Sequence, residues 1–286
     1  MEPSTIHPDT TIASVHLTVR DLGRTAAFYA ERLGFALHRR GAESAALGAG
    51  GPDLLVLVGS PGAPRVRGTA GLYHLAVLLP SRRDLGRAVA HLLAARTPLA
   101  GASDHGVSEA IYLADPEGNG IEIYRDRPRA EWPREGGELR MTTDSLDLEG
   151  LVGEAGARGG NTGALPSATR IGHVHLHVAD LEAAERFYVG VLGFERTARL
   201  GRSALFVAAG GYHHHIGLNT WAGEGAPAPP PGAAGLRLFV VQLPDASERD
   251  RVLARARGAG ASVEETEEGP TLVDPSSNRL VLAAGG

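Results

Sequence analysis

The sequence predicts an α+β fold built from four similar βαβββ modules, which form two duplicated halves of the 286-residue chain. Two observations predict it: short motifs recur at a fixed distance, and each copy passes from a strand-like to a helix-like hydrophobic period. Repetition on this scale indicates one supersecondary unit used several times, because each copy buries its apolar face against a neighbour. The length is sufficient for two ordinary domains or one repeated array.

The recurring motifs fix the module boundaries. The matching pairs, most of them 159 residues apart as Asp180 is from Asp21, are Asp21-Leu22 with Asp180-Leu181, Phe28-Tyr29 with Phe187-Tyr188, Leu33-Gly34-Phe35 with Leu192-Gly193-Phe194, Asp115-Pro116 with Asp274-Pro275, Asn119 with Asn278, and Gly71-Leu72 with Gly235-Leu236. The modules are therefore expected at 11–67, 70–127, 170–221 and 235–284, which we number one to four. Residues 8–128 hold the first pair, 129–169 a linker, and 170–286 the second pair.

Within a module, the elements follow in a constant order. Period-two alternation, as in Val174-His175-Leu176-His177-Val178, predicts the first strand. The amphipathic stretch from Ala183 to Leu192 predicts a helix, which Gly193 ends in the manner of a C-cap. Three further strand-like runs complete the unit, among them 204–207 and 215–218.

Composition excludes several kinds of site and partner. The chain has no cysteine, which excludes disulfides and thiolate metal ligands. The formal net charge of −5 disfavours nucleic acid as a partner. Neither a membrane-spanning apolar run nor a secretory signal is visible, so a cytoplasmic protein is expected. We also expect a homo-oligomer.

The repeat serves as an internal control on two polar residues of module two. His74 lies on its first predicted strand and Glu122 on its last, whereas Leu238 and Val281 stand at the corresponding places of module four. The fold therefore accepts apolar side chains at both places. A single histidine on an apolar strand is commonly a core residue, but here a carboxylate departs from the repeat together with it. A buried carboxylate needs a partner or a metal to offset its desolvation.

Module three adds a row of histidines on its first strand. His173, His175 and His177 share one face by alternation, and His173 lies where these modules begin that strand. His175 and His177 are either core residues or residues that support the site. His16 of module one corresponds to His175, while Ser14 occupies the ligand-like place, so His16 is discounted.

A second group of histidines follows in Tyr212-His213-His214-His215, predicted to lie on the last strand of module three. Alternation would then direct His213 and His215 away from His214. A cluster on the surface is the alternative.

Two neutral imidazoles and one carboxylate bind one face of a metal ion and leave the opposite positions open. This arrangement suits iron(II) enzymes that bind a substrate and O2 side by side. Manganese(II) prefers much the same ligands.

These residues make the sequence similar to the vicinal oxygen chelate superfamily and, within it, to the type I extradiol dioxygenases of the catechol-2,3-dioxygenase branch. The run His105-Gly106-Val107-Ser108-Glu109-Ala110 resembles the family's loop that contacts the substrate hydroxyls, and Tyr112 matches its active-site tyrosine. The resemblance implies His74, Glu122 and His173 as metal ligands, His105, Tyr112 and His175 as substrate-binding residues, and His214 as the acid–base catalyst beside O2, with Tyr112 and His105 assisting catalysis.

The resemblance further implies an iron(II)-dependent opening of a catechol by O2 to a muconic semialdehyde-type product, within aromatic hydrocarbon catabolism. One departure affects the fold: the six matching residues lie in modules two and three, in swapped order, rather than in three and four. Modules two and three are therefore expected to pair around the metal, and modules one and four to form a scaffold.

Two alternatives share the fold. A glyoxalase-like isomerase or lyase needs a second carboxylate opposite Glu122, and Ser203 to Trp221 contains no Asp or Glu. A resistance protein that binds a small molecule without chemistry is the non-enzymatic alternative. A fold alone does not decide among these functions.

Overall fold

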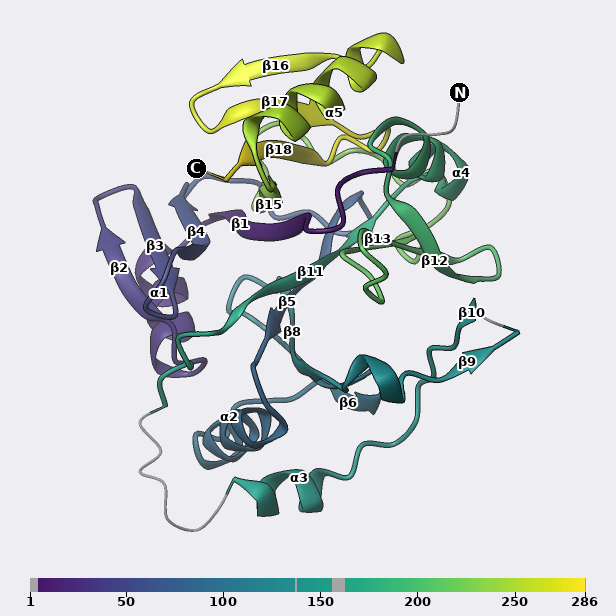
Figure 1. The fold of residues 1–286 in the computed structure, drawn as a ribbon. Coiled ribbons are helices and arrows are strands. Elements are labelled where there is room, and N and C mark those ends of the chain that lie inside the picture. Colours follow the sequence, from purple (N-terminus) through teal and green to yellow (C-terminus); the bar gives the residue numbers. More distant parts are fainter. Residues whose placement is uncertain (1–4, 137, 156–162, 286) are drawn as a thin grey trace. The chain divides into compact units, whose positions relative to one another are not determined.

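The structure, a computed structural model, describes residues 5–136, 138–155 and 163–285 (Figure 1). The chain divides into two compact units. The first comprises Met1–Leu17, Pro64–Tyr73 and Gly172–Gly286, and the second comprises Thr18–Ala63 and His74–Ile171.

Over the described residues, the strands form two eight-stranded sheets and one two-stranded sheet. In spatial order, one large sheet contains β16 (Val263–Thr266), β17 (Gly269–Val273), β18 (Arg279–Ala284), β15 (Gly235–Leu243), β1 (Thr11–Val19), β4 (Asp53–Gly59), β3 (Ser44–Gly48) and β2 (Ala36–Arg40). The other contains β12 (Glu195–Leu200), β13 (Ala204–Ala208), β14 (Ile216–Asn219), β11 (Arg170–His177), β5 (Gly71–Leu78), β8 (Gly120–Asp126), β7 (Ser108–Ala114) and β6 (Gly101–Asp104). The predicted α+β fold of repeated βαβββ modules is confirmed. That modules two and three pair around a metal stays a prediction.

Each module contributes one principal helix after its first strand. These are α1 (Leu22–Glu31), α2 (Arg82–Ala94), α4 (Leu181–Glu185, continued by a π-helical turn, Arg186–Val191) and α5 (Ala246–Gly258). An Asp or Ser side chain accepts a hydrogen bond from a first-turn N–H at every one of these helix starts, at Asp21, Ser81, Asp180 and Asp245. Such caps satisfy backbone donors that have no partner within the helix.

The two glycines predicted to end helices have the backbone conformation that this role requires. Gly34 has φ +79° and Gly193 has φ +85°, values that a side chain with a Cβ disfavours. The following N–H groups, of Phe35 and Phe194, donate to the carbonyl oxygens of Tyr29 and Tyr188 at 3.0 Å. These hydrogen bonds, each between residues six positions apart, reverse the chain in the same way at the end of both helices.

The repeated Asp-Pro motifs are anchors inside each half. The Tyr29 hydroxyl donates to Asp115 Oδ2 at 3.3 Å, and the Tyr188 hydroxyl donates to Asp274 Oδ2 at 3.0 Å. Backbone N–H groups of the same turn donate to the other carboxylate oxygen of each Asp. Burial raises the pKa of both Asp residues, and it raises the pKa of Tyr29 and Tyr188 well above the usual value. The motifs recur because each ties a module's helix to the last strands of the next module.

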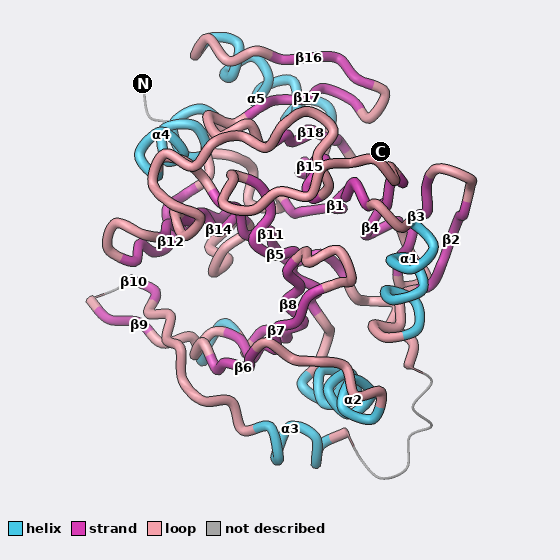
Figure 2. The backbone as a smooth tube through the Cα atoms, turned by 180° about the vertical axis from the view of Figure 1, so that it is seen from behind, coloured by secondary structure: helices cyan, strands magenta, loops and turns pink. Residues whose placement is uncertain are grey.

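The predicted linker contains structure of its own. It includes β9 (Arg134–Glu135), β10 (Glu138–Leu139) and α3 (Leu148–Glu154), and α3 lies beside α2 (Figure 2). The two helices approach closely at Gly86, where an added Cβ would lie 2.2 Å from the Leu151 carbonyl oxygen. This part of the chain therefore packs against module two rather than only connecting the halves.

Candidate functional site

Two neighbouring parallel strands of module two bring His74 and Glu122 together. His74 lies on β5 and Glu122 on β8, where the register pairs Ala76 with Glu122 and His74 with Gly120. Both side chains are therefore on the same face, and His74 Nε2 lies 3.0 Å from Glu122 Oε2. Each residue is less than 10% exposed. A buried carboxylate here has an imidazole beside it, as the comparison with module four predicted.

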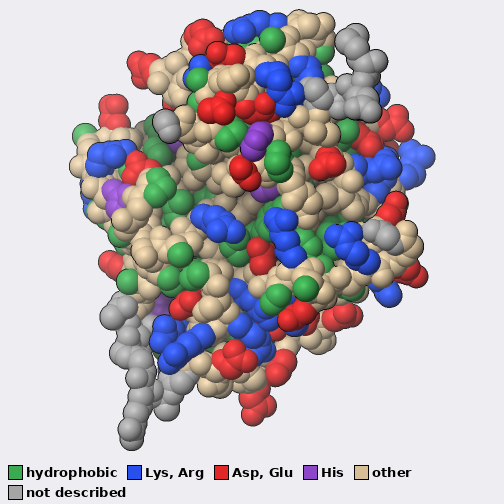
Figure 3. All heavy atoms as spheres, in the orientation of Figure 1, with side chains coloured by type: hydrophobic (Ala, Val, Ile, Leu, Met, Phe, Trp, Pro, Cys, Tyr) green, Lys and Arg blue, Asp and Glu red, His purple; other side chains and the backbone are tan. Residues whose placement is uncertain are grey.

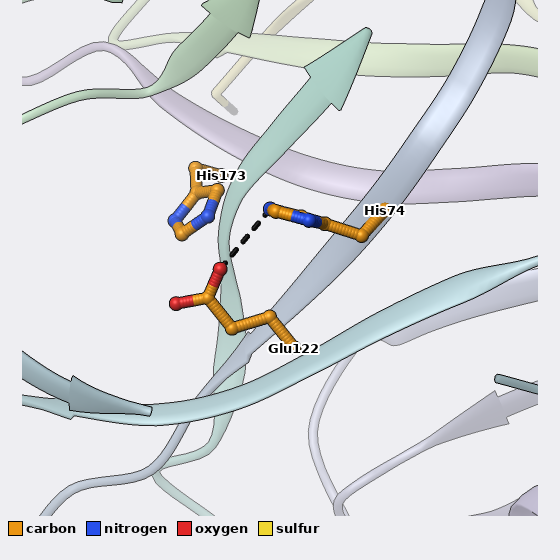
Figure 4. A group of neighbouring side chains, drawn as sticks. All are labelled: His74, Glu122 and His173. Carbon is orange, nitrogen blue, oxygen red and sulfur yellow. Dashed lines mark ion pairs between the residues drawn. The ribbon is translucent and has the colours of Figure 1, made fainter. Parts of the chain in front are cut away.

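His173 is the third member of a group that could hold a metal ion. It lies on β11 and is 1% exposed. One ligand atom from each of His74, Glu122 and His173 lies within 4.8 Å of the others, and the three side chains point toward one another (Figure 4). Two imidazole nitrogens and one carboxylate oxygen, all buried, form a donor set that suits iron(II), manganese(II) or zinc. The residues present therefore fit a divalent metal.

Tyr112 and His105 form a hydrogen-bonded pair beside His74. The Tyr112 ring centroid lies 5.8 Å from that of His74, and the β7–β8 register pairs Tyr112 with Glu122. His105 Nε2 lies 2.7 Å from the Tyr112 hydroxyl, while His105 Nδ1 lies 2.7 Å from the Thr142 carbonyl oxygen. A carbonyl oxygen only accepts hydrogen bonds, so Nδ1 carries the proton in the neutral imidazole. Nε2 then accepts a hydrogen bond from the Tyr112 hydroxyl.

The segment that holds His105 comes from the predicted linker, and we call residues 138–147 the strap. The Thr142 N–H donates to the His105 carbonyl oxygen at 3.1 Å. Asp104 and Asp144 exchange two backbone hydrogen bonds of 2.9 Å, so the strap lies alongside the end of β6. Sequence reasoning missed Thr142, because its functional group is a main-chain carbonyl that every residue has.

A buried ion-pair network lies next to the strap. Glu109 is 2% exposed and accepts hydrogen bonds from Arg125 Nε at 2.7 Å and from Arg82 Nε at 2.9 Å. Burial opposes ionisation of Asp104, but hydrogen bonds from Arg127 and from the Gly106 N–H lower its pKa overall. Glu109 was predicted only as part of the substrate loop. The structure instead places its carboxylate among arginines, where it fixes the turn that carries His105.

The histidines of module three differ from their predicted arrangement. Residues 212–215 lie in a loop, and β14 begins only at Ile216. His213 does not face away from His214, because their Nδ1 atoms lie 2.8 Å apart. Both are at most 9% exposed, so the surface-cluster alternative is also wrong. The physical reason is the pair Gly210-Gly211, whose φ values of +59° and +66° turn the chain before a strand can form.

The loop nevertheless places His214 next to the candidate ligand of its own unit. The His214 and His173 ring centroids lie 4.0 Å apart, and those of His214 and Phe206 lie 5.0 Å apart.

His175 and His177 continue the face of β11 beyond His173. The β11–β14 register pairs His175 with Gly217, where an added Cβ would lie 2.8 Å from the His175 ring. The His175 ring contacts Trp221, with centroids 5.3 Å apart. His177 Nδ1 lies 2.7 Å from Asn219 Oδ1. The His177 ring centroid lies 5.1 Å from that of Tyr73, so both residues belong to an aromatic cluster. His16, which was discounted, has its Nε2 atom 3.3 Å from Ser14 Oγ.

The face of the molecule drawn in Figure 3 carries no large patch of only positive or only negative side chains. Lys and Arg side chains are interspersed there with Asp and Glu (Figure 3). In the described part of the chain, no helix combines the length and the apolar character that crossing a membrane requires.

Comparisons with known proteins agree with this fold. The sequence pattern of the Glyoxalase/Bleomycin resistance protein/Dioxygenase superfamily matches residues 11–123 and 170–271. A catechol-2,3-dioxygenase of Bacillus subtilis (strain 168) is 47% identical over 283 residues, which are 97% of this chain and 98% of that protein. The structure of a proposed dioxygenase from Bacillus subtilis subsp. subtilis str. 168 matches with a TM-score of 0.65 at 14% identity, covering 98% of this chain and 86% of that one. Glyoxalase I from Zea mays matches with a TM-score of 0.58 at 17% identity, covering 96% and 92%. At these identities the two structures show the fold alone.

Proposed function

Because the chain belongs to the Glyoxalase/Bleomycin resistance protein/Dioxygenase superfamily, we propose that it is an iron(II)-dependent extradiol dioxygenase that opens a catechol ring with O2. The buried group of His74, Glu122 and His173 carries the proposal, since it occurs in a chain 47% identical to a catechol-2,3-dioxygenase. The product would be a ring-opened muconic semialdehyde.

The three residues would hold the metal through one imidazole nitrogen each from His74 and His173 and one oxygen of Glu122. Iron(II), when bound, supplies open positions for the substrate oxygens and for O2, together with the electron transfer that their reaction requires. Manganese(II) fits the same donor set and is the second candidate.

Tyr112 would orient the substrate and accept its proton. Because the Tyr112 hydroxyl donates to His105 Nε2, its oxygen lone pairs are the part that can accept a hydrogen from a catechol hydroxyl. Transfer of that hydrogen would move the Tyr112 proton to His105 Nε2. The resulting imidazolium would keep its Nδ1–H bond to the Thr142 carbonyl, which stabilises the added charge. His105 would thus act through Tyr112.

His214 would be the acid–base group on the other side of the substrate. Its ring lies against that of His173, a candidate metal ligand, so an imidazole nitrogen of His214 would exchange a proton with the reacting oxygen. General acid–base catalysis of this kind contributes roughly 10²–10⁴ in rate.

The test is a ring-cleavage assay on protein reconstituted anaerobically with iron(II), manganese(II) or no metal, with catechol and substituted catechols. We expect metal-dependent formation of the semialdehyde and consumption of one O2 per catechol. Conversion of a glutathione hemithioacetal without O2 consumption would favour the glyoxalase-like alternative instead. Tight binding of aromatic compounds with no turnover under any metal would favour a resistance protein.

A further inference from the structure

A β-bulge interrupts β12, the edge strand that lies beside β13 (Figure 1). The register shifts between Arg196 and Ala198, so Thr197 is an extra residue opposite β13. A bulge of this kind changes the direction in which a side chain points, and bulges are common beside functional sites. The bulge therefore gives the Thr197 side chain a direction that a regular strand would not give it.

Two arginines beside Thr197 show the effect of the bulge on side-chain direction. Arg196 and Arg199 are three residues apart, so in a regular strand their side chains would point to opposite faces. Because the bulge adds one residue, both reach the same carboxylate. Arg196 donates to Glu185 Oε1 at 3.0 Å, and Arg199 donates to Glu185 Oε2 at 2.7 Å. The bulge is thus connected to α4, in which Glu185 is the last residue.

The Thr197 hydroxyl reaches the loop that carries His214. Its Oγ1 atom lies 2.6 Å from the His213 carbonyl oxygen and 3.2 Å from the Phe206 carbonyl oxygen. A hydroxyl has one hydrogen, so the shorter contact is the stronger hydrogen bond. His213 is fully buried, and a buried carbonyl oxygen that loses a donor carries a free-energy penalty. The hydroxyl therefore stabilises this conformation of the loop.

The carbonyl that accepts this hydrogen bond belongs to the peptide group that leads into His214. A peptide group is planar, so fixing the His213 carbonyl oxygen also fixes the direction of the His214 N–H and limits the direction of the His214 side chain. On the other side of His214, the His215 N–H donates to the Val207 carbonyl oxygen at 2.9 Å. The backbone of His214 thus lies between two anchors, and Thr197 supplies the first of them.

The corresponding bulge of module one anchors a different group. The β2 register shifts between Leu37 and Arg39, which places His38 at the position of Thr197, 159 residues earlier. His38 Nδ1 lies 2.8 Å from Oδ1 of Asp53, the first residue of β4. The bulge therefore belongs to the framework of both halves, whereas in module three its side chain binds the backbone beside a residue of the candidate site.

The position of His214 matters for the role proposed for it, because proton transfer requires hydrogen-bond contact with the reacting group. A displacement of about 1 Å can lower a rate by about 10²-fold. The His214 ring centroid lies 4.0 Å from that of His173. Resting on the function proposed above, we propose that Thr197 is a positioning residue. Through the His213 carbonyl it holds the backbone of His214 and so keeps this imidazole against His173.

The first experiment compares substitutions that remove and retain the hydroxyl. Thr197→Val keeps the shape of the side chain and should lower kcat for catechol by roughly 10- to 100-fold, with KM and metal content unchanged. Thr197→Ser retains the donor and should recover most of the rate. The matched control is Thr266→Val, which removes a hydroxyl that donates to the Gly269 carbonyl oxygen at 3.0 Å in the same unit, and should leave kcat unchanged. An unchanged kcat in Thr197→Val, or an equal loss in Thr197→Ser, would overturn the proposal.

The second experiment tests whether Thr197 acts through His214. If it does, removing the hydroxyl from a protein that already lacks the imidazole costs nothing more, because both changes remove the same contribution. The double variant Thr197→Val/His214→Phe should therefore turn over catechol at the rate of His214→Phe alone. A clear further loss would show that the hydroxyl acts independently of His214, and the proposal would be wrong.

A third measurement needs no turnover and separates this proposal from the function it rests on. Amide hydrogen exchange of residues 212–215 should be roughly 5- to 10-fold faster in Thr197→Val than in the wild-type protein, and unchanged in Thr266→Val. Unchanged exchange in Thr197→Val would refute the anchor even in an active dioxygenase. Failure of the wild-type protein to cleave any catechol would refute the dioxygenase, while hydrogen exchange would still test the anchor.

Discussion

Modules two and four have the same strand framework, but the side chains buried at corresponding positions are polar in module two and apolar in module four. Register pairs Ala76 with Glu122 on β5 and β8, and it pairs Val240 with Val281 on β15 and β18. The third strand agrees as well, since Tyr112 lies opposite Glu122 and Thr271 lies opposite Val281. Val281 is fully buried, as Glu122 nearly is. The same positions therefore hold either an apolar core or a polar group that could bind a metal.

The Asp-Pro turns show which positions are tied to the framework instead. Asp115 and Asp274 each accept hydrogen bonds from two backbone N–H groups, one Asn side chain and one Tyr hydroxyl. The two copies agree in every one of these partners. The comparison teaches that identity between copies identifies the scaffold, whereas a correlated difference between copies identifies the candidate site.

Replacing His74 with its module-four counterpart gives the largest expected effect. His74→Leu should fold, because Leu238 is accommodated at the same place, but it should lose metal and ring-cleaving activity. Metal analysis and circular dichroism check this, with His16→Leu as the matched control that retains about one metal ion per chain. Full metal occupancy in His74→Leu, or its failure to fold, would contradict the assignment.

His214→Phe separates the acid–base role from a ligand role. The variant should keep its metal and bind catechol, yet turn over roughly 10²–10⁴ more slowly. Single-turnover kinetics and metal analysis measure both quantities. Metal loss would make His214 a ligand, and unchanged turnover would require another proton donor.

Val281→Glu installs the module-two carboxylate without its imidazole partner. We expect a loss of about 3–5 kcal/mol in the free energy of unfolding at neutral pH, because a buried carboxylate is left uncompensated. Burial should raise the pKa of the new Glu above its unfolded value, so the loss appears as pH rises through that range and shrinks at lower pH. Urea unfolding at several pH values measures it, with Val281→Gln as the uncharged control. The double variant Leu238→His/Val281→Glu should recover part of the loss; no recovery would count against His74 as the partner that makes Glu122 tolerable.

Removing the anchoring hydroxyls has the smallest expected effect. Tyr29→Phe and Tyr188→Phe should each lower the free energy of unfolding by about 1–2 kcal/mol at neutral pH. Burial raises the pKa of Asp115 and Asp274, and the Tyr hydroxyl bond opposes that rise, so each variant raises its Asp pKa further. The deficit is therefore present above the folded-state pKa and disappears as falling pH protonates the carboxyl. Denaturant unfolding checks both variants; clearly unequal losses would show that the two anchors are not equivalent.

The sequence predicted the framework and part of the candidate site for the same reason, the duplication. His74 and Glu122 stood out because module four supplies a version without them. The loop at 212–215 was predicted as strand because its residues run into Ile216 and Leu218, although Gly210-Gly211 signals a turn. The pairing of His105 with Tyr112 depends on the fold of a hairpin, and the Thr142 contact depends on a main-chain atom. Neither of these two contacts can be recognised from residue types or from their spacing in the sequence.

The strap has no counterpart in any of the four modules, yet the carbonyl oxygen of its Thr142 determines which nitrogen of His105 carries the proton. A chimera that joins the first half of this chain to the second half of a relative would therefore be sensitive to its junction. A crossover before Thr142 would keep the side chains of His74, His105, Tyr112 and Glu122 and still exchange the backbone that sets the His105 tautomer. A crossover after Asp147 would keep that backbone with module two. The strap must therefore come from the same protein as the first half of the chain.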